Sequence, residues 1–163
     1  MKSSVALTFD RLRLYLAEDD LTQAILDELR QTLTVDRVVL YSFNSERIGQ
    51  VTFESLSDRK LSILISSGAD ECFNSEYSQL YENGRIRAIA DIESEPIESC
   101  HRDFLRELQV KANLVVPILS DLKLWGLLVA HHCQSTFDWS ANDILAMQAT
   151  ASNLSIVGDR LDS

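Results

Sequence analysis

The chain is poor in the residues that mark several common classes of protein. It has three cysteines and five glycines among 163 residues. An odd number of cysteines, without a secretory signal after Met1, favours a reducing cytoplasm over a disulfide framework. The glycines are scattered, so the sequence offers no glycine-rich loop for a phosphate or an oxyanion.

Positive charge and long apolar runs are also lacking. The formal net charge of −10 argues against nonspecific binding of nucleic acid and against attraction to an anionic membrane surface. No apolar run approaches the length of a membrane span. A hydrophobic fraction of 45% in 163 residues is sufficient for one domain with a real core. We therefore expect a single domain over residues 1–163, with a core at about residues 19–158.

Helical periodicity predicts helices at both ends of the chain and in its middle. Leucines at helical spacing predict two helical segments near the N-terminus, and Asp19 or Asp20 is expected to cap the second of them. The expected helices cover residues 7–16, 21–33, 97–108 and 138–156, with a short helix around residues 77–81.

Runs of alternating apolar residues predict strands between these helices. The expected strands cover residues 35–43, 51–56, 60–65, 86–89, 113–119 and 124–133. This order predicts an α+β fold, with a central antiparallel sheet, the terminal helices on one face and a pocket on the other.

Two cysteines lie in polar surroundings and are candidates for covalent chemistry. Cys72 lies in the run DECF at residues 70–73, and a buried structural thiol is the alternative there. Cys100 precedes His101 in the first turns of a predicted helix, where the helix dipole favours a thiolate. Cys100 shares a helical stripe with apolar residues 97, 104 and 108, so we expect it on the inner side of that helix.

Other readings of the cysteines and histidines are less favoured. Cys133 is expected to be a half-buried structural residue at a strand end, on one face with Leu127, Val129 and His131. A zinc site has no C-x-x-C or H-x-x-x-H spacing to support it. A nucleophilic enzyme built on Cys100 and its neighbouring histidine is a minority interpretation, because adjacent residues on a helix diverge by about 100°.

Several motifs in order resemble the bilin-binding GAF domains, and more narrowly the cyanobacteriochromes. The run at residues 70–73 is similar to the D-x-C-F motif of their dual-cysteine branch. The resemblance extends from about residue 21 to residue 156. The other motifs that carry it are GRIRAIADI at residues 84–92, Cys100-His101, KANLVVPI at residues 111–118 and LWGLLVAH at residues 124–131.

The resemblance implies a photosensor that carries a linear tetrapyrrole. The bilin expected is phycocyanobilin, either as such or isomerised to phycoviolobilin. In this family the cysteine matching Cys100 forms a permanent thioether to the A-ring side chain. The cysteine matching Cys72 adds reversibly to the central methine carbon, which shortens the conjugated system and moves absorption to the violet or blue. Light drives a Z-to-E rotation next to the D ring.

The resemblance also implies further bilin contacts. Asp70 matches a carboxylate near the pyrrole nitrogens, with a helix cap as the alternative. His131 matches a histidine near the D ring, with a strand residue satisfied by backbone as the alternative. Arg85 matches a propionate partner, with a solvated surface arginine as the alternative. The remaining residues expected at the pocket are Phe73, Tyr81 and His101.

Two departures from the family pattern bear on the pocket. The first strand reads Tyr41-Ser42-Phe43 where relatives often read Tyr-Arg-Phe, which removes one propionate contact. No tryptophan occurs between residues 51 and 69.

We expect a light sensor that is not itself an enzyme and that forms one module of a larger signalling protein. Its expected partners are the bilin and the other domains of that protein, with a homodimer through the terminal helices left open. Neither nucleic acid nor direct membrane insertion is expected. The alternatives are a GAF domain for another small ligand, such as a cyclic nucleotide, and a cysteine-based GAF-fold reductase.

Overall fold

The computed structural model describes residues 4–43, 49–64, 75–121 and 123–162, and side chains within these except at 4–18, 75–77 and 158–162. Five strands form one antiparallel sheet in the order β2-β1-β5-β4-β3. The strands are β1 (Arg37–Phe43), β2 (Gly49–Leu56), β3 (Arg87–Ile89), β4 (Ala112–Ser120) and β5 (Lys123–His132).

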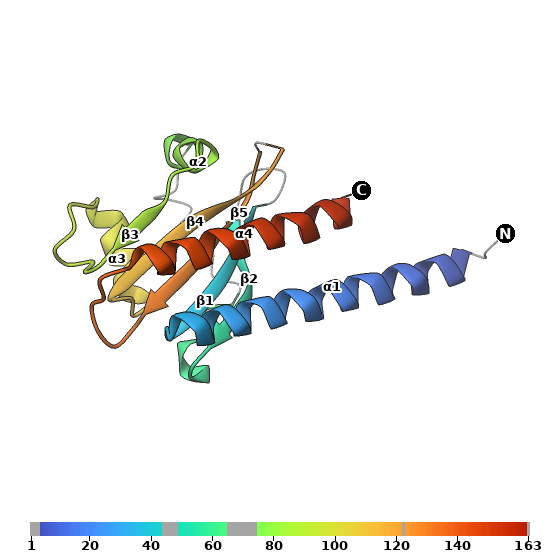
Figure 1. Cartoon of the computed structure of the whole chain (residues 1–163), viewed down its shortest axis with the longest axis horizontal. Helices are drawn as coiled ribbons and strands as arrows, with labels where there is room; N and C mark the ends of the chain where they lie inside the picture. The colour runs from blue at the N-terminus through green and yellow to red at the C-terminus, as the bar shows by residue number, and fades with distance from the viewer. Residues whose placement is uncertain (1–3, 44–48, 65–74, 122, 163) are drawn as a thin grey trace.

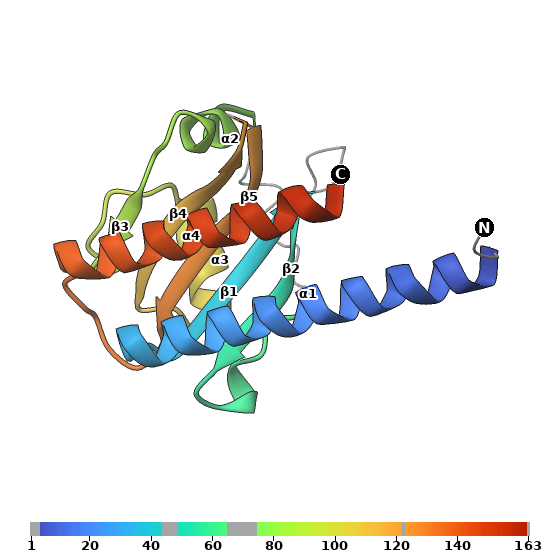
Figure 2. The ribbon, with the colours of Figure 1, turned by 45° about the vertical axis from the view of Figure 1, so that its right-hand side comes forward.

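Helices cover both faces of this sheet. The long terminal helices α1 (Ser4–Leu33) and α4 (Ala141–Asp162) lie side by side on one face, and the N-terminal half of α1 projects beyond the sheet (Figures 1 and 2). The shorter helix α3 (Ser99–Glu107) lies behind the sheet, and α2 (Ser75–Glu82) lies at one end of it (Figure 1). The predicted α+β arrangement is confirmed. None of the helices in the described ranges contains an apolar stretch that could span a bilayer.

Strand alternation divides the core into a layer on each face of the sheet. The layer under α1 and α4 contains Leu40 and Leu128 from the central strands and Met147 from α4, all almost fully buried. The opposite layer is made by the strand side chains that point to the other face of the sheet, together with Tyr81 of α2. Its strand residues are Val39, Tyr41, Val51, Val115, Leu127 and Val129. This second layer forms the floor of the face on which α3 lies.

Two expected helix boundaries were wrong. Helix α1 runs without a break through Asp19 and Asp20, which are exposed inside it rather than capping a second helix. An exposed aspartate in the middle of a helix costs little, and no glycine or proline interrupts the run. Helix α4 begins at Ala141 rather than Asp138, because Ser140 and Asp143 form a capping box with backbone-to-side-chain distances of 3.1 and 2.9 Å.

The expected strand at residues 60–65 was also wrong over its described part. Residues 59–61 form a short 3₁₀ turn instead, and the Asp58 carboxylate caps it by accepting from the Lys60 N–H at 2.9 Å. The Glu54 carboxylate accepts from the Ile63 N–H at 2.9 Å. Side-chain oxygens therefore take the backbone donors that a sheet ladder would have used.

Candidate functional site

Cys100 is the second residue of α3, as the sequence predicted, but it does not lie on the inner side of the helix. Its side chain is exposed, whereas Leu105 is buried in a cluster with Ile89, Ile92 and Val110. Five residues along a helix turn by about 500°, so Cys100 lies about 140° around the axis from Leu105. The Cys100 sulfur is disulfide-bonded in this structure, so the thiol must be reduced before it can add to a ligand.

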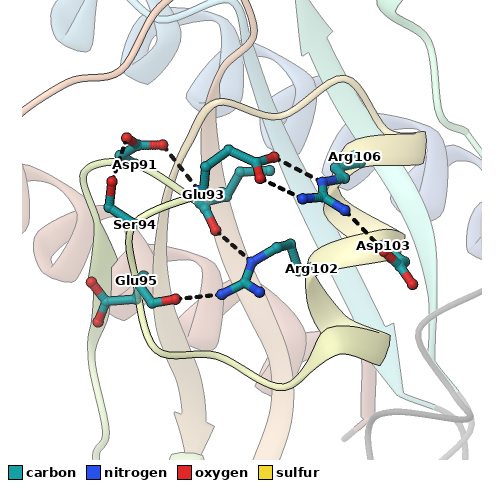
Figure 3. A network of polar contacts seen from close by, with 8 residues as sticks. Asp91, Glu93, Ser94, Glu95, Arg102, Asp103 and Arg106 are labelled. Atoms are coloured by element: carbon teal, nitrogen blue, oxygen red, sulfur yellow. Dashed lines mark hydrogen bonds and ion pairs between the residues drawn. The ribbon is translucent and has the colours of Figure 1, made fainter.

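An arginine from α3 fixes this helix to the loop that precedes it (Figure 3). Arg102 donates from Nε to the Ile92 carbonyl at 3.0 Å and from Nη2 to the Glu95 carbonyl at 2.6 Å. The N-terminal end of α3 carries no side-chain cap, because the extended Glu98 makes no capping hydrogen bond. Arg102 therefore supplies a fixed connection where the helix start has none.

A second arginine makes an exposed contact one turn later. Arg106 and Glu93 form an ion pair with both side chains about half exposed, and Arg106 also reaches Asp103 at 3.3 Å. The pairing raises the pKa of Arg106 and lowers the pKa of Glu93. The loop itself is closed by Asp91, whose carboxylate accepts from the Glu93 N–H at 2.9 Å and from the Ser94 hydroxyl at 2.8 Å (Figure 3).

His101, next to Cys100, is half-buried beside two arginines. Burial, and then the charges of Arg87 and Arg85, lower the pKa of His101 to about 4. The imidazole is therefore neutral at pH 7, and the positive charge in its surroundings comes from the two guanidinium groups. A neutral ring beside two fixed cations favours an anionic partner at this position.

Arg85 and Tyr81, two of the residues expected at the pocket, are in contact with each other. The guanidinium carbon of Arg85 lies 5.8 Å from the centre of the Tyr81 ring, within the range of a cation–π contact. Tyr81 is buried in the second core layer, so this contact places Arg85 over the face opposite the terminal helices.

Arg87 is a site residue that the sequence analysis missed. Its Nε atom is buried without a hydrogen-bond partner, and its charge acts on His101. A buried donor without a partner is rare in folded proteins and requires an acceptor to complete it. The signal in the sequence was the R-x-R spacing with Arg85, because alternate residues of an extended segment share a face.

His131 lies apart from this basic group, at the end of β5. It is 3% exposed, and its Nδ1 accepts a hydrogen bond from Arg37 Nε at 3.0 Å. Burial, followed by the Arg37 charge, lowers the pKa of His131 well below its usual value. The ring is thus satisfied by a side chain rather than by backbone, and Arg37 is a second residue that sequence reasoning missed.

The structure brings some of the predicted residues together and leaves others undescribed. Arg85 lies over Tyr81, and its charge acts on His101, the chain neighbour of Cys100. Three predicted site residues lie outside the described part of the chain, namely Asp70, Cys72 and Phe73. Cys133 is half-buried with a free thiol, as predicted, and burial raises its pKa. In the described ranges no three His, Cys, Asp or Glu side chains are grouped to hold a metal ion.

The fold and the site define an α+β domain that presents a helix-borne cysteine beside a basic group on the face opposite its terminal helices. The family model described as "GAF domain" matches residues 18–157. The chain belongs to the GAF domain family.

Several curated proteins are similar to this chain in sequence. An uncharacterized protein of Picosynechococcus sp. strain PCC 7002 is 46% identical over 145 residues, which cover 89% of each chain. A putative methyl-accepting chemotaxis protein of Synechocystis sp. strain PCC 6803 is 40% identical over 72% of this chain and 12% of its own length. The matched region is therefore a small part of the second relative.

Many solved structures are similar to this chain in fold, and several of them also in sequence. The blue-light absorbing form of the Thermosynechococcus elongatus PixJ GAF domain is 36% identical, with a TM-score of 0.78 and 90% of each chain covered. The phycocyanobilin-bound GAF domain of a cyanobacterial phytochrome is 29% identical, with a TM-score of 0.81 and coverage of 94% of this chain and 90% of that one.

Proposed function

We propose that this GAF domain is a photosensor that binds a linear tetrapyrrole covalently through Cys100. The observation that carries the proposal is the exposed Cys100 in the first turn of α3, beside His101 and two arginines. Its support from comparison is the similarity to solved GAF domains of PixJ and of a phytochrome that binds phycocyanobilin.

Attachment at Cys100 is an addition that balances without an oxidant. The sulfur forms a bond to the carbon side chain of a terminal bilin ring, the carbon–carbon double bond there is consumed, and the thiol proton ends on the neighbouring carbon. The first turn of a helix favours the thiolate that attacks. Exposure of the Cys100 side chain leaves room for a large ligand to approach.

The two arginines fit the acidic groups of such a ligand. A bilin carries two propionates, and Arg87 offers a buried Nε without a partner while Arg85 lies over Tyr81. Guanidinium groups bind carboxylates through paired donors. Strand β1 has Ser42 where relatives often have arginine, and its hydroxyl contacts the Thr52 hydroxyl at 2.7 Å. We infer that Arg87 supplies the carboxylate contact that β1 lacks.

The finer steps extend this proposal. Once bound, the bilin, phycocyanobilin or its isomer phycoviolobilin, absorbs light and isomerises between Z and E forms. Cys72 adds reversibly to its central methine carbon, with Asp70 and Phe73 beside it in the D-x-C-F motif. His101 packs against the ring system as a neutral side chain. These roles rest on the sequence motifs and on the similar photoreceptor domains.

The domain acts as the sensory module of a larger cytoplasmic signalling protein and has no catalytic activity of its own. The relatives include a putative chemotaxis protein that is far longer than this chain. Helix α1 runs for 30 residues and extends past the sheet, which suits it to pass a signal along its axis or to pair with a second copy.

Co-production with phycocyanobilin tests the proposal. Reduced wild-type protein should retain pigment after denaturing electrophoresis, and Cys100→Ala should lose it. Cys133→Ala is the matched control and should keep the pigment. A colourless wild-type protein that binds a cyclic nucleotide, or that reduces a substrate through its thiols, would replace this proposal with one of the two alternatives.

A further inference from the structure

Arg37 of β1 is a buried cation whose hydrogen bonds within the described residues all go to uncharged acceptors. It is 1% exposed. Its Nε donates to His131 Nδ1 at 3.0 Å, its Nη1 to the Leu61 carbonyl at 2.6 Å and its Nη2 to the Leu108 carbonyl at 2.7 Å. Burial lowers the pKa of Arg37, but a guanidinium remains charged in proteins. A charge withdrawn from water without a bonded counter-charge is costly, so its position requires a physical explanation.

The carbonyl that accepts from Nη2 belongs to the residue that ends α3. Leu108 is the C-cap of this helix. The N–H groups of Gln109 and Val110 donate back to carbonyls of the last turn at 2.9 and 3.0 Å, which is the pattern of a Schellman motif. Those two bonds do not use the Leu108 carbonyl. Arg37 supplies a donor for it, and a cation at the C-terminal end of a helix also suits the helix dipole.

The backbone just after α3 is held in a conformation that its sequence disfavours. Gln109 has a φ of 63°, in the left-handed region where glycine is the usual residue of a Schellman motif. A residue with a side chain stays in this region only where the surrounding structure fixes it. The Arg37 contact to the preceding carbonyl is one such interaction. The end of α3 is therefore set by specific contacts rather than by the local preference of the chain.

The second carbonyl bonds the same guanidinium to the turn after β2. Leu61 closes the 3₁₀ turn at residues 59–61. It is 24 residues from Arg37 in the sequence, whereas Leu108 is 71 residues away. The guanidinium is planar and holds its donors in a rigid fork. It therefore keeps the end of α3 and the turn after β2 in one fixed relation to strand β1.

Helix α3 is thus bonded to neighbouring backbone at both ends. Arg102 near its start donates to two carbonyls of the preceding loop, and Arg37 donates to the carbonyl that ends it. Cys100 is the second residue of the helix and Leu108 its C-cap, so about 12 Å along the axis separates them at 1.5 Å per residue. A helix of this length moves as a rod, so a shift of its end displaces the thiol.

We propose that Arg37 is a positioning residue for the Cys100 thiol. By bonding the carbonyl that ends α3 to strand β1 and to the turn after β2, it fixes the helix in the pose from which the thiol reaches a large ligand. This inference rests on the proposed function for the addition at Cys100. The placement of the helix does not depend on the ligand, and it is tested first without one.

NMR of reduced, bilin-free wild-type protein labelled with nitrogen-15 arginine tests the contacts. Hydrogen bonds from both Nη groups hinder rotation of the guanidinium. Arg37 should therefore give two resolved Nη signals, identified by nuclear Overhauser contacts to residues 61 and 108. A single averaged Nη signal, or signals without these contacts, would overturn the proposal. This measurement needs neither a bilin nor a variant that folds.

Hydrogen exchange of two variants tests what the contacts hold. Arg37→Gln removes both the charge and the fork, whereas Arg37→Lys keeps a cation that cannot reach both carbonyls. In each variant the amides of residues 59–62 and 108–110 should exchange roughly tenfold faster or more, while those of β5 change less. Arg106→Ala is the control on the same helix and should leave residues 59–62 unchanged. Wild-type protection of both segments, or an equal increase throughout the sheet, would refute the proposal. If neither variant folds, the NMR result decides.

Attachment kinetics with phycocyanobilin separate positioning from binding. At saturating bilin the first-order rate should fall roughly tenfold or more in Arg37→Gln and Arg37→Lys, with a smaller change in the half-saturating concentration. Iodoacetamide should modify the exposed Cys100 at nearly the wild-type rate, because a small reagent reaches the thiol in any pose of the helix. Arg106→Ala is again the control and should behave as wild type in both reactions.

Two results separate this inference from the proposed function. A wild-type attachment rate in both Arg37 variants, or an equal fall in the bilin and iodoacetamide reactions, would refute the positioning role while leaving the photosensor proposal intact. Failure of the wild-type protein to take up bilin would refute the proposed function, and the NMR and exchange results would still decide whether Arg37 fixes α3.

Discussion

Arg102 and Arg106 make a matched pair for testing what holds helix α3 in place. They lie one turn apart on the same helix and both reach back to the preceding loop (Figure 3). Arg102 donates to two backbone carbonyls, those of Ile92 and Glu95, from a half-buried position. Arg106 pairs with the Glu93 carboxylate, with both side chains about half exposed.

The two arginines should differ in their contribution to the free energy of unfolding. A hydrogen bond from a charged donor contributes about 1.5–3 kcal/mol, and water recovers part of this where the site is partly open. Two such bonds at the lower end of this range predict that Arg102→Ala loses about 2–3 kcal/mol. The charges of Arg106 and Glu93 stay solvated and are screened by salt, so Arg106→Ala should lose clearly less.

Urea denaturation of both variants measures this difference, with stability read from the midpoint at unchanged slope. Arg102→Ala should also slow covalent attachment of bilin at Cys100, because the loop that holds the start of α3 is released, while Arg106→Ala should attach it at nearly the wild-type rate. A larger loss of stability in Arg106→Ala than in Arg102→Ala would refute the reasoning, since exposed pairing would then outweigh the backbone contacts.

Three further predictions concern single groups. The free energy of unfolding should fall as pH drops below about 6.5, because His101 and His131 have lowered pKa values in the folded protein and the unfolded chain therefore binds protons first. The expected slope is up to about 1.4 kcal/mol per pH unit for each ring. A urea midpoint that stays the same between pH 7 and pH 5 would contradict this. Arg87→Gln should raise the pKa of His101 above its value of about 4 in an NMR titration, with an unchanged value excluding the contact. Cys133→Ala should lower the free energy of unfolding by about 1 kcal/mol and leave the absorption spectrum of pigmented protein unchanged. A large spectral shift would show that Cys133 takes part in the site.

Periodicity and alternation were sufficient to predict the layers of this fold. The pattern of β4 and β5 identified both strands, and leucines at helical spacing identified the second half of α1. The wrongly predicted strand after β2 is explained by side chains that compete with strand pairing for backbone hydrogen bonds. Asp58 and Glu54 captured backbone N–H groups after β2, and side-chain capture of this kind leaves no periodic signal in sequence.

Site residues that belong to a sequence motif could be predicted, whereas those defined by a contact between distant parts of the chain could not. Cys100 and His101 follow from the motif and its place at the start of a helix. Arg37 contacts His131 across a separation of 94 residues, and no local pattern announces such a pair. The exposed position of Cys100 depends on how α3 rotates to bury Leu105, which is set by packing rather than by spacing alone.

The light-minus-dark absorption difference spectrum of reduced, phycocyanobilin-loaded wild-type protein tests the central claim most directly. The account predicts two states that interconvert reversibly under alternating light, one of them absorbing in the violet or blue through the second bond to Cys72. Cys72→Ala should keep the pigment on Cys100 and lose that short-wavelength state. A protein that takes up no bilin, or that binds it and shows no light-dependent difference, would contradict the claim that this GAF domain is a photosensor.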